Sequence, residues 1–224
     1  MTITDLPGKR AHVKMAPEQR VADIMADGGP PAGARDSAVL VLLIPANNGT
    51  SESSLMDWRV VLIKRNTYEG VHSGQIAFPG GKCEKADKGV IDTAYREAFE
   101  ELGIVRENTE TVCQLTHIYI PPSNFTIYPI LAFAKEELRF SLDPREVVEY
   151  KEIEIRMFNP EFSECRRLET IRGEWVNAPG FVIGDYFVWG ATAMILSELY
   201  QLVAEAKLSM SLSNMYISSS KPSI

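Results

Sequence analysis

Apolar and polar residues follow strand patterns in five stretches of the chain. Ala38–Pro45 is apolar throughout, as in a strand that is buried on both faces of a sheet. Trp58–Arg65 has a similar composition and predicts the hairpin partner of that strand. Thr111–Tyr119 and Thr126–Phe133 predict two more strands around a proline-containing loop. Glu152–Ile155 alternates like a strand with one solvent-exposed face.

Three other stretches have the spacing of amphipathic helices. His12–Met25 predicts one short helix, with His12 on the protein surface. Ile91–Leu102 predicts a second helix, which Asp92 or Thr93 could cap at its start and Gly103 could end. Trp189–Ala206 predicts a C-terminal helix that packs on the sheet.

The remaining segments suggest how the chain is divided. Residues 1–35 predict an N-terminal extension that contains the short helix and a Gly/Pro linker. Residues 36–206 predict the main domain, and 207–224 a serine-rich mobile tail. Within the main domain, 161–169 is polar and predicts irregular structure, whereas 174–183 predicts a β-hairpin.

Composition narrows the class of partner. The net charge of −7 argues against a nucleic-acid backbone or an anionic membrane as the main partner. No stretch approaches the ~20 apolar residues of a membrane span. Three cysteines without a C-x-x-C pair predict reduced thiols and a cytoplasmic protein. An acidic protein can bind an anionic phosphate group through a bridging cation. The acidic residues of the second helix are candidates to bind such a cation.

That helix gathers carboxylates on one side. Its apolar arc contains Ile91, Ala94, Tyr95, Ala98, Phe99 and Leu102. Glu97, Glu100 and Glu101 fall on the other arc, where we expect them to converge. Oxygen-only ligands suit Mg²⁺ or Mn²⁺, and Arg96 beside them could fix one glutamate through a bidentate pair. For an E-x-x-E-E pattern alone, a solvated acidic face would be the simpler interpretation.

The residues around this helix carry a family resemblance. Gly81, Asp87 and the run Arg96–Ile104 are similar to the Nudix box, G-x5-E-x7-R-E-U-x-E-E-x-G-U, where U is a bulky apolar residue. Two departures occur, because Asp87 replaces a glutamate and eight residues, not seven, separate it from Arg96. The resemblance implies a Nudix-type α/β/α sandwich with a mixed sheet and a loop–helix–loop catalytic motif. It also implies a metal shell of Glu97, Glu100, Glu101 and the Gly81 carbonyl, with Mg²⁺ or Mn²⁺ bound. By the same resemblance, we predict that Arg96 is one of the catalytic residues.

A narrower resemblance concerns the substrate. Leu62–Arg65, Gly74 and Phe78–Gly81 resemble the signature that precedes the box in the coenzyme A pyrophosphatase subgroup, and Asp185–Ala193 resembles its C-terminal stretch. The pattern departs at Ile63, Asn66 and Gly70, where the subgroup has Thr, Ser or Ala, and Arg. The implied reaction is hydrolysis of coenzyme A or an acyl-CoA to 3′,5′-ADP and 4′-phosphopantetheine.

Several alternatives to that reaction remain open. One is a Nudix pyrophosphatase that acts on ADP-ribose or another nucleotide derivative. A second is an isopentenyl diphosphate isomerase, although Cys83 is poorly placed for that chemistry. A third is a non-catalytic nucleotide-binding module on the same fold. The family resemblance also predicts a homodimer. Nothing in the composition tests that prediction.

Outside the box, further residues are candidates for the site. Two basic residues, a loop histidine and three residues of a polar–aromatic loop are candidates for substrate contacts. They are Lys64, Arg65, His72, Ser123, Asn124 and Phe125. The alternative for these residues is an ordinary structural role. By resemblance, an acid after the fourth strand would serve as a further ligand or general base. Glu146 is our candidate for that role, and Glu149 is held in reserve.

Overall fold

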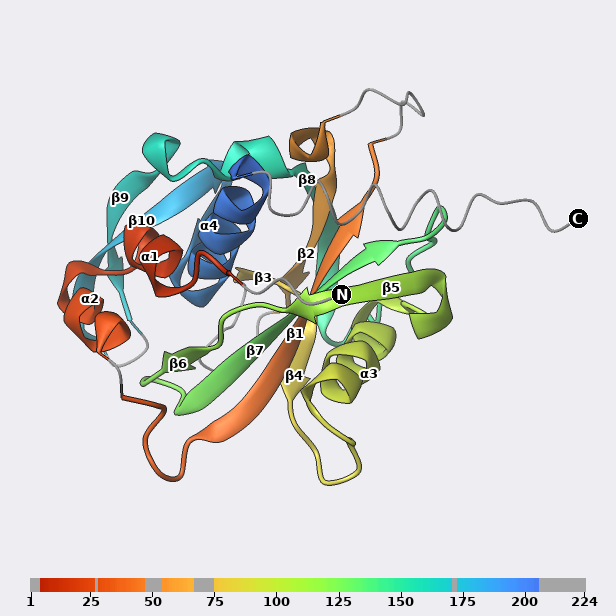
Figure 1. Ribbon diagram of the computed structural model, residues 1–224, viewed down its shortest axis with the longest axis horizontal. Helices are drawn as coiled ribbons and strands as arrows, with labels where there is room; N and C mark the ends of the chain where they lie inside the picture. Colours follow the sequence, from red (N-terminus) through yellow and green to blue (C-terminus); the bar gives the residue numbers. More distant parts are fainter. Residues whose placement is uncertain (1–4, 27, 47–53, 67–74, 171–172, 206–224) are drawn as a thin grey trace, which may run out of the picture.

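The computed structural model describes residues 5–26, 28–46, 54–66, 75–170 and 173–205. Its helices and strands run in the order shown in Figure 1, where helical turns of the 3-10 type are written η. The elements are α1 (Lys9–His12), η1 (Val13–Met15), α2 (Glu18–Met25), β1 (Arg35–Ile44), η2 (Leu55–Asp57), β2 (Arg59–Arg65), β3 (Ile76–Ala77), β4 (Gly80–Lys82), α3 (Val90–Leu102), η3 (Arg106–Asn108), β5 (Thr109–Gln114), β6 (Ile118–Ile120), β7 (Phe125–Ala134), β8 (Val147–Glu154), η4 (Ile155–Phe158), η5 (Pro160–Phe162), β9 (Glu164–Glu169), β10 (Trp175–Ile183), β11 (Tyr186–Trp189) and α4 (Gly190–Ala204).

The main sheet is mixed, as predicted. Within the described residues it has eight strands, in the order β3-β2-β1-β7-β5, with β4 paired to β1, β6 to β7 and β8 to β2. Strands β1 and β7 run parallel over nine residue pairs, and the other pairings are antiparallel. Strand β1 is central and almost wholly buried, which confirms the apolar run as a strand covered on both faces.

A helix covers each face of this sheet. Helix α3 packs on β1, β4 and β7, and its apolar side shares one core with residues such as Leu40 and Ile63. On the opposite face, α4 closes a second core that includes Leu43, Leu62 and Phe181. Figure 1 shows α3 and α4 on opposite sides of the sheet. The predicted α/β/α sandwich is therefore confirmed.

The second, smaller sheet corrects two predictions. Residues 161–169 contain a strand, β9, and do not form irregular structure throughout. Residues 174–183 form the single strand β10, which pairs with β9 and β11, so the predicted hairpin within them is wrong. Strand β9 has five exposed residues of six, which explains why it lacks the alternation of a half-buried strand.

Two further predictions of elements need correction. The stretch 111–119 is not one strand, because β5 ends at Gln114 and β6 begins at Ile118, both paired to β7. The N-terminal helix is divided into α1, η1 and α2, and α2 begins directly after Pro17, a residue that a helix tolerates only in its first turn. His12 is 1% exposed, so its expected surface position is wrong.

The division into three regions stays a prediction. Residues of the expected extension nevertheless pack into the α4-side core, because Met15 and Ala16 belong to that core and α1 contacts α4. The expected tail, 207–224, lies outside the described residues.

Candidate active site

The site is built on two adjacent glycines at the start of β4. Gly80 and Gly81 pair with Val39 and Ala38 of the central strand. Gly80 has φ +152°, and a Cβ there would lie closer than 3.0 Å to the backbone of both β1 residues. Only glycine fits such a close approach of two backbones, so the Gly-Gly pair allows β4 to lie directly against β1.

Glu101 lies inside the protein, which the sequence pattern did not predict. It is 0% exposed, its Oε2 accepts a hydrogen bond of 2.8 Å from the Gly80 N–H, and its Oε1 is 2.9 Å from Arg65 Nη1. Burial raises the pKa of Glu101 to about 7, although Arg65 and the Gly80 N–H both favour its charged form. No described group donates a well-aligned hydrogen bond to Oε1. This buried oxygen therefore has unused acceptor capacity.

Glu97 packs against the second glycine. A Cβ on Gly81 would lie closer than 3.0 Å to the Glu97 carboxylate, so the absence of a side chain at 81 is what admits this group. The Glu97 side chain is 14% exposed, and burial raises its pKa above the usual range. Two carboxylates, Glu97 and Glu101, are thus partly or fully desolvated beside one turn.

Arg96 fastens the loop between β4 and α3 to the helix. Its guanidinium donates to both oxygens of Asp87, at 3.0 and 3.1 Å, and to the Lys82 carbonyl at 3.0 Å. The same group donates to Glu97 at 2.8 Å and to Glu100 at 3.2 Å. Hydrogen bonds from Arg96 hold the Asp87 pKa well below its usual range. Asp87, which departs from the family pattern, therefore still anchors the arginine of the box.

The helix itself differs from its predicted faces at Phe99 and Glu101. Phe99, expected on the apolar arc, is 59% exposed, whereas Glu101, expected on the polar arc, is buried. The Glu100 side chain is 52% exposed. Neither Asp92 nor Thr93 caps the helix, because its N-cap residue is Gly89 with no side-chain hydrogen bond. Gly103 ends it with φ +69°, as predicted.

The predicted basic pair, Lys64 and Arg65, is divided between the two faces of β2. Arg65 points toward α3 and contacts Glu101. Lys64 lies on the other face, 3.8 Å from Glu149 and with its Nζ 5.1 Å from the centroid of the Tyr186 ring. Glu149 also bonds to Lys151 and accepts a short hydrogen bond from Tyr186. Lys64 and the reserve acid Glu149 are therefore separated by the sheet from Glu97 and Glu101.

The remaining predicted site residues do not all lie at one place in the structure. Glu146 is exposed, and its charge is one of those that raise the pKa of Glu101, so it lies on the α3 side. His72 lies outside the described residues. In the 121–125 loop, the Ser123 carbonyl accepts a 2.9 Å hydrogen bond from Arg35, and the Asn124 side chain bonds to Tyr119 and the Gly33 carbonyl. The Phe125 ring lies 4.0 Å from the Arg35 guanidinium. These groups hold the loop to the start of β1.

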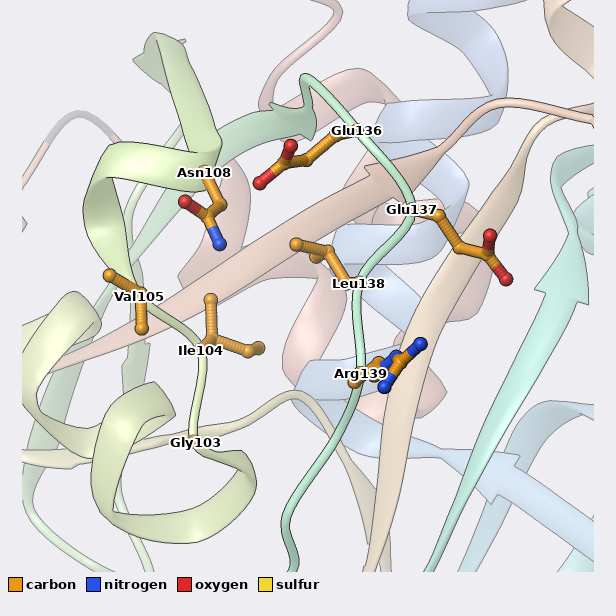
Figure 2. A pocket seen from close by; sticks show the side chains of 8 residues that line it. All are labelled: Gly103, Ile104, Val105, Asn108, Glu136, Glu137, Leu138 and Arg139. Carbon is orange, nitrogen blue, oxygen red and sulfur yellow. The ribbon is translucent and has the colours of Figure 1, made fainter.

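Two cavities lie elsewhere on the molecule. One, of about 310 Å³, adjoins the C-terminal end of α3. Figure 2 shows Asn108 and Glu136 pointing toward one another there, with Ile104 and Leu138 nearby. The other, of about 190 Å³, lies between the N-terminal helices and β6 and includes Pro121. Neither cavity is lined by a residue that the sequence assigned to the site.

The donor set fits a hard divalent cation. It offers oxygen ligands only, it contains a buried carboxylate oxygen with spare acceptor capacity, and its glycine turn leaves room for a carboxylate. Within the described ranges, no three His, Cys, Asp or Glu side chains stand together in a group that could hold a metal ion. Glu97 and Glu100 instead contact Arg96, and Glu101 contacts Arg65. The expected convergence of all three glutamates does not occur in this conformation.

Comparison with known proteins identifies the family. The model of the NUDIX domain family matches residues 35–176. The chain belongs to the Nudix family. It is also 30% identical, over 74% of its length and 81% of the relative's, to a protein from Pectobacterium atrosepticum called uncharacterized Nudix hydrolase NudL. The expected Nudix fold and enzyme class are thereby confirmed: the protein is a hydrolase of the pyrophosphatase type.

Other Nudix relatives extend the comparison. The chain is 31% identical to Nudix hydrolase 15, mitochondrial, of Arabidopsis thaliana, and covers 55% of that protein. It is 31% identical, over 63% of its own length and 61% of the relative's, to human mitochondrial coenzyme A diphosphatase NUDT8. Among solved structures, the Nudix hydrolase RenU from M. smegmatis is similar with a TM-score of 0.53 and 18% identity, over 85% of this chain and 94% of the other. The last likeness supports the fold alone. None of the helices in the described residues is long and apolar enough to cross a membrane.

Two contacts near the Nudix site were not predicted from the sequence. Thr93 donates a 2.8 Å hydrogen bond from its Oγ1 to Asp87 and so supports the Arg96 anchor. The sequence signal for this contact was a threonine one helical turn before Arg96. The contact of Arg65 with Glu101 was not predicted, because it joins residues 36 positions apart on different elements.

Proposed function

We propose that this Nudix enzyme hydrolyses the diphosphate bond of coenzyme A or an acyl-CoA, giving 3′,5′-ADP and 4′-phosphopantetheine. The observation that carries the hydrolytic part is the pair of desolvated carboxylates, Glu97 and Glu101, held against the Gly80–Gly81 turn. The substrate assignment is supported by the residues around 62–81 and 185–193, and by the human relative named as a coenzyme A diphosphatase.

Mg²⁺ or Mn²⁺ would be held by the Gly81 carbonyl, Glu97, Glu100 and Glu101. When bound, such an ion neutralises diphosphate charge and lowers the pKa of a bound water. The chain's own contribution is to keep these oxygens in place. Arg96 binds Glu97 and Glu100, and the Gly80 N–H binds Glu101. Arg96 therefore acts through the carboxylates that it orients.

The reaction needs one base. A water oxygen bonds to one phosphorus, the bridging P–O bond breaks, and the water proton passes to a carboxylate. Glu100 and Glu146 are the candidates, because both are exposed and can exchange the proton with solvent. Glu149 is less suited, because Lys151 and Tyr186 already bind it on the other face of the sheet.

The test is a substrate panel of coenzyme A, acetyl-CoA, ADP-ribose, NADH and diadenosine polyphosphates, each with Mg²⁺ or Mn²⁺. We expect 3′,5′-ADP from coenzyme A to form well ahead of the other products, and Glu101→Gln to abolish it. Preference for ADP-ribose would keep the hydrolase and reject the substrate. Gly70, where the subgroup has an arginine, is the position that favours this second outcome. A cytoplasmic location and a homodimer also stay predictions.

A further inference from the structure

Arg65 contacts the Glu101 carboxylate and the Gly80 carbonyl at once. It is the last residue of β2, and its side chain is 18% exposed. Its Nη1 lies 2.9 Å from Glu101 Oε1, and its Nη2 donates a short hydrogen bond to the Gly80 carbonyl. Since Glu101 in turn accepts from the Gly80 N–H, the side chains of Arg65 and Glu101 and the backbone of Gly80 form a closed ring of contacts.

This ring controls more than Glu101. The Gly80 carbonyl belongs to the peptide that joins Gly80 to Gly81, so the Arg65 contact also fixes the orientation of Gly81. Gly81 in turn packs directly against the Glu97 carboxylate. Rotation of that peptide would move the Gly81 backbone toward or away from Glu97. One guanidinium therefore bears on both desolvated carboxylates.

We infer that Arg65 is a positioning residue for the metal-binding oxygens and not a contact for the substrate's phosphates. Its Nη1 is already in ion-pair contact with Glu101, its Nη2 already donates to the Gly80 carbonyl, and little of its side chain reaches solvent. An ammonium group cannot reproduce this arrangement, because it lacks the planar fork that reaches two acceptors in fixed directions. This inference rests on the proposed divalent-metal site.

The experiment compares Arg65→Lys with Arg59→Lys. Arg59 begins the same strand, is similarly buried at 22% exposed, and pairs with Glu152 away from the glycine turn, so it is a matched control. Affinity for Mn²⁺ alone is measured by electron paramagnetic resonance, kcat and KM by product formation, and folding by circular dichroism. Because lysine keeps the charge, a change in Mn²⁺ affinity reports geometry and not net electrostatics.

We expect Arg65→Lys to weaken Mn²⁺ binding roughly tenfold or more and to lower kcat on the order of 100-fold, with KM changed by less than about threefold. Arg59→Lys should match the wild type in all three. A raised KM with unchanged Mn²⁺ affinity would show a phosphate contact and overturn the inference. If the wild type turns over no substrate, the proposed function fails, but the Mn²⁺ affinities still decide the role of Arg65.

A second variant guards against loss of folding. Arg65→Gln retains one donor for the Gly80 carbonyl and removes a positive charge next to the site. Charge alone would tighten Mn²⁺ binding in this variant, whereas loss of positioning weakens it, so the sign of the change is diagnostic. If both variants fail to fold while Arg59→Lys folds, Arg65 serves the fold as a whole and the inference is overturned.

Discussion

Gly81 and Glu97 are in direct contact, and the contact depends on the missing side chain of the glycine. A Cβ on Gly81 would approach the end of the Glu97 side chain, whereas a Cβ on the neighbouring Gly80 would meet backbone atoms of β1. The two glycines therefore have different functions. Gly80 allows β4 to pair with β1, and Gly81 leaves room for a carboxylate.

The first prediction separates these functions. Gly81→Ala should leave the fold intact, because Glu97 is flexible and can move aside, but turnover should fall on the order of 100-fold since a catalytic oxygen is displaced. Gly80→Ala should instead lower the free energy of unfolding by about 2 kcal/mol or more. Urea denaturation and initial rates measure the two effects.

The control is Gly28→Ala, because a Cβ at Gly28 would meet nothing within 4 Å. It should behave like the wild type in both measurements. Equal loss of stability in Gly80→Ala and Gly81→Ala would refute the division of roles.

A second prediction concerns acid stability. The folded-state pKa of Asp87 is depressed by Arg96, so its contribution to stability is complete above the unfolded-state pKa of about 4 and is lost as pH falls through the folded-state value. Asp87→Asn should lower the free energy of unfolding at pH 7 by about 2 kcal/mol and should flatten the decline in stability below pH 5. Denaturation curves between pH 7 and strong acid test this, and an unchanged acid slope would contradict it.

The sequence predicted the helix and its closing Gly103, because these depend on local geometry and residue type. It could not place Glu101. A helical wheel assigns a glutamate to the polar side, yet the Gly80 N–H and Arg65 face this one and make its burial tolerable. Phe99 shows the reverse, since the wheel cannot reveal that, within the described part of the chain, this ring stays 59% exposed.

Long-range partners account for the other errors. His12 is polar and precedes a surface-type helix pattern, so nothing near it in sequence indicates that Glu198 receives it in the core. Strand β9 exists because β10 supplies its hydrogen bonds, and its own residues are almost all exposed. The burial of His12 thus depends on a residue far away in sequence, and the strand β9 depends on pairing with β10. The pattern of apolar and polar residues encodes neither.

The third prediction orders the cysteines by reactivity. Burial, with a smaller effect of the Glu198 charge, raises the pKa of Cys113 to about 11, so at pH 8 roughly one thousandth of this thiol is thiolate. Cys165 is exposed. Iodoacetamide should therefore modify Cys165 first and Cys113 last, as followed by mass spectrometry of peptides. In concentrated guanidinium chloride the difference should disappear, and early labelling of native Cys113 would contradict the prediction.

The last prediction concerns the buried pair that joins the N-terminal helices to α4. His12 Nε2 lies 2.8 Å from Glu198 Oε2, and Glu198 Oε1 also accepts from the Gly8 N–H and from both the N–H and the hydroxyl of Thr116. Glu198 is 0% exposed. Glu198→Ala would leave all these donors without an acceptor and should lower the free energy of unfolding by about 3–5 kcal/mol.

Thr116→Val removes one donor and keeps the acceptor, so it should cost only about 1 kcal/mol. Glu136→Ala, at an exposed glutamate, is the control and should change stability by less than about 0.5 kcal/mol.

Because α4 and α3 cover opposite faces of the sheet, the activity of folded Glu198→Ala should equal that of the wild type at temperatures where it remains folded. A fully stable Glu198→Ala would show that the pair does not hold the N-terminal helices. Reduced activity in the folded variant would show that the two faces are coupled through strands that contribute to both cores, among them β1, β2 and β7.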